Sequence, residues 1–199
     1  MYSQAYQDKF VDIVLDSPTE GFFVDVGAGC DDERGIGSNS LMFEQRGWKG
    51  IAIDAGGAAR LKNRSCKCVG CYIGDGTGET KILSDVLKEN DCPQIIDYLS
   101  LDIDGFDLIA LKSFFDTGYE FKVATVEHNL YSLDPKYKGW KEQFFDLMSR
   151  NGCIRVVDNV GHMAFAGNLH NGWAFEDWYI NPKYVNYRDV MSKINRMKN

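Results

Sequence analysis

The chain has 199 residues, of which 44% are hydrophobic and 13% aromatic, and its formal net charge at pH 7 is −7. A chain of this length and hydrophobic content can bury one self-sufficient core, which excludes a disordered chain, and we expect a single domain over residues 1–199. The negative charge gives no basic footprint for DNA or RNA and argues against a nucleic-acid partner.

The predicted elements alternate between short apolar runs and stretches whose apolar residues have helical spacing. In chain order they are helix 6–15, strand 22–26, helix 38–46, strand 49–54, strand 67–73, helix 84–90, strand 95–103, helix 106–115, strand 122–127, helix 140–150, strand 153–160 and strand 173–180. Parallel strands need crossover helices and are buried on both faces. The alternation therefore predicts an α/β sandwich, with a mostly parallel, seven-stranded sheet and helices on both faces.

The chain carries no visible targeting or membrane-spanning segment. Its longest apolar runs fall far short of the ~20 residues that cross a bilayer, and its first residues lack a basic start followed by an apolar stretch. We therefore expect an intracellular, cytoplasmic protein with no membrane partner.

Six cysteines in such a compartment are too few for a disulfide scaffold, and we expect free thiols. Cys66, Cys68 and Cys71 have the look of a metal knuckle, but a structural zinc site needs four ligands. Their spacing favours alternating residues of a buried strand instead.

Ligands of parallel α/β sheets bind beyond the carboxyl ends of the strands. The polar residues that end four of the predicted strands are Asp25, Asp54, Asp102 with Asp104, and Glu127 with His128. These side chains are the candidates for binding and chemistry.

The first strand runs into Gly27-Ala28-Gly29, where small residues let a ligand approach the backbone. A dinucleotide fingerprint would need a third glycine at position 32, where Asp32 stands, so a nicotinamide cofactor is disfavoured. S-adenosylmethionine carries a sulfonium and an ammonium group and no phosphate, so neighbouring acids favour it. We expect Asp25 and the backbone of residues 27–29 to bind its amino-acid half, and Asp54 to bind its ribose hydroxyls.

Six blocks, in order, resemble the FkbM family of S-adenosylmethionine-dependent methyltransferases. They are Tyr2-Ser3-Gln4-Ala5-Tyr6-Gln7-Asp8, Gly21-Phe22-Phe23-Val24-Asp25-Val26-Gly27-Ala28, Ser38-Asn39-Ser40, Glu44-x-x-Gly47-Trp48-Lys49-Gly50, residues 96–105 (Ile-Asp-Tyr-Leu-Ser-Leu-Asp-Ile-Asp-Gly) and Val126-Glu127-His128-Asn129. The resemblance spans about residues 1–180. It implies a class I methyltransferase fold, which is Rossmann-like, and O-methylation of a hydroxyl on a sugar or glycosylated small molecule. It also implies that Asn39 and Asp102 take part in donor binding.

A sugar hydroxyl attacks a methyl group poorly until its proton is removed or a metal holds its oxygen. The expected reacting centre is Asp102, Glu127 and His128. In one interpretation, Asp102, Asp104 and Glu127 bind Mg²⁺ or Mn²⁺, which prefer hard oxygen ligands. In the other, His128 is the general base and Glu127 orients it.

The acceptor is expected to be a neutral or weakly charged saccharide held partly by aromatic faces. Residues 162–179 contain His162, Phe165, His170, Trp173, Phe175, Trp178 and Tyr179 and no lysine or arginine. Most of these aromatic side chains are expected in the core, and a minority in the acceptor pocket. Two other classes stay open, namely a nicotinamide-dependent oxidoreductase or epimerase and a non-catalytic α/β binding module.

Overall fold

The computed structural model describes residues 2–29, 37–62, 64–161 and 173–197. Its main sheet has seven strands in the order β3-β2-β1-β6-β7-β9-β8. Their bounds are β1 Phe22–Val26, β2 Lys49–Asp54, β3 Lys67–Gly70, β6 Ile95–Leu101, β7 Glu120–Glu127, β8 Ile154–Gly161 and β9 Ala174–Ile180. The first five strands of this order pair in parallel, and β9 runs antiparallel to both β7 and β8. The expected mostly parallel, seven-stranded sheet is confirmed.

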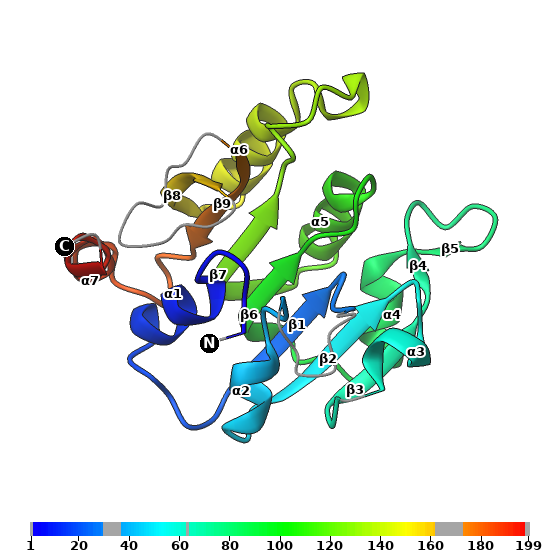
Figure 1. The fold of residues 1–199 in the computed structure, drawn as a ribbon, viewed down its shortest axis with the longest axis horizontal. Helices are drawn as coiled ribbons and strands as arrows, with labels where there is room; N and C mark the ends of the chain where they lie inside the picture. The colour runs from blue at the N-terminus through cyan, green and yellow to red at the C-terminus, as the bar shows by residue number, and fades with distance from the viewer. Residues whose placement is uncertain (1, 30–36, 63, 162–172, 198–199) are drawn as a thin grey trace.

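Helices cover both faces of the sheet. Their bounds are α1 Gln7–Val14, α2 Leu41–Gln45, α3 Ala58–Leu61, α4 Leu83–Glu89, α5 Asp107–Asp116, α6 Trp140–Arg150 and α7 Tyr187–Met197, and a 3₁₀ turn, η1, spans Pro135–Tyr137. Side chains of α1, α2 and α7 share one core cluster, and side chains of α4, α5 and α6 share another. Figure 1 shows α1, α2 and α7 toward one side of the sheet and α4, α5 and α6 toward the other.

The two-residue period of each strand assigns its side chains to these two layers. In β6, Tyr98 packs in the cluster of α1 and Leu99 in the cluster of α5. Strands β1, β6 and β7 are apolar along most of their length. Asp25 is the last residue but one of β1, Asp102 directly follows β6, and Glu127 is the last residue of β7. These positions leave the candidate residues at one edge of the sheet.

The third predicted strand is shorter and more exposed than expected. β3 ends at Gly70 and lies at the edge of the sheet, while Tyr72–Ile73 forms β4, which pairs with β5 (Thr80–Lys81). Cys68 is exposed and Cys66 and Cys71 are half-buried, so the interpretation as a buried strand is wrong. The reason is position, because an edge strand has a neighbour on one side only.

The five described cysteines are free, as expected, and Cys30 lies outside the described residues. They form no metal-ligating group within the ranges given above. Across those same ranges, the structure has no helix long and apolar enough to cross a membrane.

Candidate functional site

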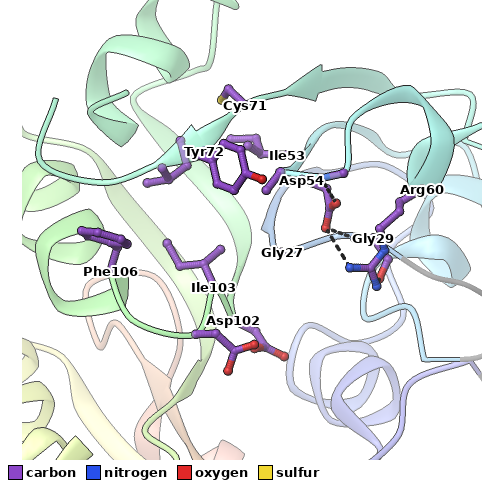
Figure 2. Close-up of a pocket in the computed structure, with 14 residues that line it drawn as sticks. Gly27, Gly29, Ile53, Asp54, Arg60, Cys71, Tyr72, Asp102, Ile103 and Phe106 are labelled. Carbon is purple, nitrogen blue, oxygen red and sulfur yellow. Dashed lines mark hydrogen bonds and ion pairs between the residues drawn. The ribbon is translucent and has the colours of Figure 1, made fainter. Parts of the chain in front are cut away.

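A cavity of about 640 Å³ opens where β1, β2 and β6 end. Its lining residues are Gly27, Gly29, Ile53, Asp54, Ala55, Gly56, Arg60, Cys71, Tyr72, Ile73, Asp102, Ile103, Asp104 and Phe106. Figure 2 shows Tyr72, Ile103 and Phe106 toward one side of this cavity and Asp54 with Arg60 toward the other. One side therefore suits a flat apolar ring, and the other suits groups that donate hydrogen bonds.

Two glycines make this cavity possible. Gly27 has φ +89°, and a Cβ built on it would lie 1.6 Å from the backbone oxygen of Asp102. A Cβ on Gly29 would lie 2.3 Å from Oδ2 of Asp54. Only glycine lets the turn after β1 pass this close to the ends of β6 and β2.

Asp54 is the last residue of β2, and its carboxylate accepts hydrogen bonds from the backbone after β1 and after β2. Oδ2 accepts a hydrogen bond from Gly29 N at 2.9 Å, and Oδ1 accepts one from Gly56 N at 2.7 Å. The Arg60 guanidinium lies 3.9 Å from Oδ2 and donates to the Gly29 carbonyl. Since each carboxylate oxygen has a second lone pair, Asp54 can still accept from a ligand's hydroxyls.

Asp25 lies elsewhere than expected. It is buried in β1 and does not line the cavity. Ser40 Oγ donates a hydrogen bond to it, and the Arg64 guanidinium lies 4.0 Å from its carboxylate. Burial raises its pKa, while Arg64 and Ser40 act in the opposite direction. Asp25 thus fixes the chain before α2.

Ala28 and Asn39 also lie off the cavity lining. Ala28 packs with Ala52 and Leu61, and the Asn39 amide donates to Ser100 Oγ at 3.0 Å. Oδ1 of Asn39 is buried without a partner, which leaves it an acceptor for a ligand near the end of β6.

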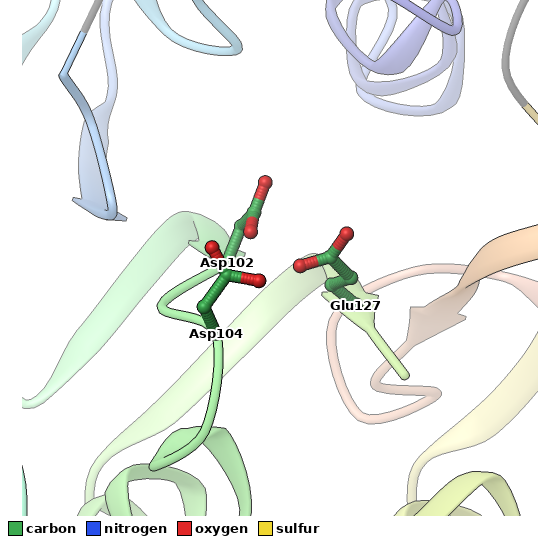
Figure 3. Close-up of side chains that lie close together, drawn as sticks. All are labelled: Asp102, Asp104 and Glu127. Carbon is green, nitrogen blue, oxygen red and sulfur yellow. The ribbon is translucent and has the colours of Figure 1, made fainter. Parts of the chain in front are cut away.

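Three carboxylates meet at the Asp102 end of the cavity. Asp102, Asp104 and Glu127 each offer an oxygen, and these three oxygens lie within 4.8 Å of one another. Figure 3 shows the three side chains gathered from the ends of β6 and β7. Neither Asp104 nor Glu127 forms an ion pair with a described lysine or arginine.

The buried member of this group is Glu127, which is 7% exposed and has one oxygen, Oε2, without a partner. Burial raises its pKa well above the usual range, and the neighbouring Asp102, Asp107 and Asp104 charges raise it further. A bound cation would reverse this shift, because it would favour the ionised carboxylates. The arrangement therefore suits a divalent cation or another positively charged group.

The turn after β6 brings Asp104 into the cluster. The strand ends at Leu101, and Asp104 has φ +54°, so strand alternation does not place it beside Asp102. Asp107 holds this turn, since its carboxylate accepts hydrogen bonds from Ile103 N at 2.8 Å and Gly105 N at 3.2 Å. Burial raises the pKa of Asp107 to about 6.

The described partners of the His128 ring are not the three carboxylates. The ring is 1% exposed; Nδ1 accepts from Leu130 N at 3.1 Å, and Nε2 lies 3.3 Å from Asp177 Oδ1. The partner that orients His128 is therefore Asp177. The interpretation of the sequence in which Glu127 orients His128 is wrong. Because both ring nitrogens are engaged in the core, His128 is not placed to take a proton from an acceptor.

The aromatic residues near β9 divide sharply. Phe175, Trp178 and Tyr179 are at most 1% exposed, and Trp178 stacks on Phe10, so they are core residues. Trp173 is 63% exposed and lies beside Tyr131. His162, Phe165 and His170 lie outside the described residues.

Sequence reasoning missed three kinds of site residue. Arg60 lies on the unpredicted helix α3, while Tyr72 and Phe106 contribute the apolar side of the cavity. Glu176 pairs in register with Glu127 and is buried, and burial raises its pKa to about 8. Only Glu176 had a sequence signal, as an acid within an apolar strand.

Solved structures with the same fold are distant in sequence. Spermidine synthase from Thermotoga maritima aligns with a TM-score of 0.52 at 14% identity over 98% of this chain, and a spermidine synthase complexed with the transition-state analogue AdoDATO aligns equally well. This chain covers 65% of the length of each of those chains. Precorrin-6y C5,15-methyltransferase from Geobacter metallireducens GS-15 aligns with a TM-score of 0.49 at 13% identity over 87% of this chain and 86% of its own.

No protein-family model matches the chain, and no curated protein matches it either. The spermidine synthase likeness, together with the strand order, shows a Rossmann-like α/β fold.

Proposed function

We propose that the protein is an S-adenosylmethionine-dependent O-methyltransferase that acts on a hydroxyl of a sugar or glycosylated small molecule. The observation that carries this proposal is one cavity that runs from Asp54, at the end of β2, to Asp102 and Asp104, beyond the end of β6. The six-block resemblance to the FkbM family supports membership of that family and supplies the sugar acceptor.

The cavity suits the methyl donor along its length. Asp54 can accept hydrogen bonds from both ribose hydroxyls, and the side of Tyr72, Ile103 and Phe106 can cover the adenine ring. The donor has no phosphate, so it tolerates the acidic surroundings, and the carboxylates at the Asp102 end attract its positively charged half.

The residues at the Asp102 end also fit a divalent cation. Asp102, Asp104 and Glu127 supply three hard oxygen ligands, and the unpartnered Oε2 of Glu127 gives a buried oxygen that a cation would satisfy. Bound there, Mg²⁺ or Mn²⁺ would lower the pKa of an acceptor hydroxyl and orient it. We propose these three residues as its ligands.

In the reaction, the acceptor oxygen attacks the methyl carbon in line, and the bond from that carbon to sulfur breaks. The products are the methyl ether, S-adenosylhomocysteine and one proton. Glu127 is the group placed to receive that proton, because His128 is engaged with Asp177. Asp102 and Asp104 would stabilise the positive charge that develops on the acceptor oxygen before its proton leaves.

The test is methyl transfer from labelled S-adenosylmethionine to a panel of simple methyl glycosides, with and without excess chelator. We expect incorporation that falls at least 100-fold in Glu127→Gln and Asp102→Asn, while Glu89→Gln, an exposed acid paired with Lys81, has parental activity. Full activity in excess chelator would exclude a role for the metal and leave Glu127 as the general base. Transfer to amines and to no glycoside would overturn the acceptor class.

The two other classes are separated by a thermal-shift panel. Stabilisation by S-adenosylhomocysteine is expected. Stabilisation by NAD or NADP alone would favour the oxidoreductase or epimerase, and stabilisation by none of these would favour the binding module.

A further inference from the structure

Two exposed aromatic rings lie side by side, and one of them, Tyr131, lies within electrostatic reach of the three carboxylates. Tyr131 is 40% exposed and Trp173 is 63% exposed, and their ring centroids are 6.2 Å apart with an interplanar angle of 54°. They come from different parts of the chain, since Tyr131 follows β7 and Trp173 precedes β9. A backbone hydrogen bond from Tyr131 N to Ala174 O, at 3.0 Å, joins the two segments.

Contiguous exposed apolar side chains mark a binding surface more often than scattered ones do. The sequence neighbours of the two rings show what ordinary packing looks like here, because Phe175 and Trp178 are at most 1% exposed. Tyr131 and Trp173 are exposed instead, as are Leu130 (52%) and Leu133 (99%), which lie close to Tyr131 in the sequence.

The location of these rings links them to the reacting centre. Tyr131 lies four residues after Glu127, and besides burial, the charges of Glu127 and Asp104 raise its pKa. Tyr137, from the same connection between β7 and α6, donates a hydrogen bond to Asp104 Oδ1 at 3.4 Å. Tyr131, Tyr137 and Trp173 do not line the donor cavity.

The three carboxylates thus have the donor cavity on the side of β1 and β2 and the exposed rings on the side of β7 and β9. A methyl acceptor must approach opposite the sulfur, because the displacement is in line. The rings lie on the side that is left for it.

We propose that Tyr131 and Trp173 form the acceptor platform, on which the apolar C–H face of a sugar ring lies while its hydroxyl reaches Asp104 and Glu127. Aromatic faces cover the C–H face of a saccharide, and nearby carboxylates accept from its hydroxyls. The basic residues of this connection are Lys136 and Lys138, both exposed, and Lys136 lies near Asp134 and the Tyr137 ring. This inference rests on the proposed function and adds Tyr131, which the sequence had not singled out.

The test measures glycoside binding and turnover separately from donor binding. Four probes are used: methyl β-D-glucopyranoside, methyl β-D-galactopyranoside, methyl α-D-mannopyranoside and methyl α-L-rhamnopyranoside. Their binding is followed by saturation-transfer NMR in the presence of S-adenosylhomocysteine, and KM is measured for any probe that is methylated. The variants are Tyr131→Ala, Trp173→Ala and Trp173→Phe, with Tyr187→Ala, an exposed tyrosine on α7, as the matched control.

We expect both ring deletions to weaken glycoside binding or raise KM at least tenfold, with unchanged affinity for S-adenosylhomocysteine. Trp173→Phe should keep most of the binding, because it keeps an aromatic face, and Tyr187→Ala should match the parent. Parental glycoside binding in both ring deletions overturns the platform even if methyl transfer occurs, and so does the absence of any glycoside binding. If the parent protein does not bind S-adenosylhomocysteine, the proposed function is overturned instead. In that case, glycoside binding measured in the absence of S-adenosylhomocysteine still tests the platform.

Discussion

The replacement of Asp54 by asparagine tests the donor site most finely, because it changes charge and hydrogen bonding with almost no change of shape. In the parent, two carboxylate oxygens serve two backbone N–H groups, those of Gly29 and Gly56. Asparagine offers one oxygen, so one of these N–H groups faces the side-chain NH₂. The variant also loses the charged acceptor for the ribose hydroxyls.

The cost to donor binding follows from these contacts. A hydrogen bond to a charged group contributes about 1.5–3 kcal/mol, and an unmatched polar group costs about 1–3 kcal/mol. The second cost falls partly on the free protein, so we assign about 2–3 kcal/mol to binding. This predicts that Asp54→Asn binds S-adenosylhomocysteine about 30- to 150-fold more weakly than the parent.

Titration calorimetry with S-adenosylhomocysteine and with its 2′-deoxy analogue measures this loss as a double-mutant cycle. Removing the 2′-hydroxyl should weaken binding to the parent and have little further effect on the variant. The matched control is Asp134→Asn, an exposed aspartate that also caps a backbone N–H, that of Lys136. Binding of the variant within threefold of the parent, or fully additive effects in the cycle, would refute the ribose assignment.

Three further predictions concern stability. Gly27→Ala should lower the urea midpoint of unfolding far more than Gly78→Ala. A Cβ on Gly27 would meet a backbone oxygen at 1.6 Å, while a Cβ on Gly78 meets nothing within 4 Å. Equal losses in the two variants would contradict the close approach at Gly27. Burial raises the pKa of Glu176 to about 8, so the free energy of unfolding should fall as pH rises from about 4.5 to 8. Urea titrations at pH 5.5 and 8 should show a smaller fall in Glu176→Gln. An equal fall in the variant and the parent would count against the raised pKa. Trp178→Ala should cost about 3–5 kcal/mol of unfolding free energy and Trp173→Ala less than ~0.5 kcal/mol, since one ring is buried and the other exposed; similar costs would show that the two tryptophans are not so divided.

Element positions were most predictable where one pattern dominated. Strand β2 and helix α6 have the predicted bounds, because an apolar run ends at Asp54 in one and apolar residues keep helical spacing in the other. Helix α7 was not predicted. Its apolar face depends on two buried residues, Val190 and Ile194, in a polar stretch, and this face is stabilised by packing on α1 that a local pattern does not show.

The site was predictable as a set of strand ends but not as a set of contacts. The sequence placed Asp54, Asp102 and Glu127 at the correct edge, since each directly follows an apolar run. It could not place Asp25, whose partners Ser40 and Arg64 come from distant segments. It also could not place His128, whose partner Asp177 lies on β9, far along the chain.

The convergence of Asp104 with Asp102 has a different origin. It depends on a left-handed residue and on the hydrogen bonds that Asp107 accepts from the turn after β6. The sequence predicted Asp102 and Asp104 as neighbours because both stand at the end of one strand, whereas their convergence depends on the backbone conformation of this turn.

The central claim is that one cavity presents a methyl donor to the carboxylates at the ends of β6 and β7. A crystal structure of the protein with S-adenosylhomocysteine tests it most directly. The account predicts the ribose hydroxyls on Asp54, the adenine between the strand ends and the side of Tyr72 and Phe106, and the sulfur directed toward Asp102 and Glu127. A ligand bound elsewhere, or bound in the cavity with its sulfur turned away from those carboxylates, would contradict the account.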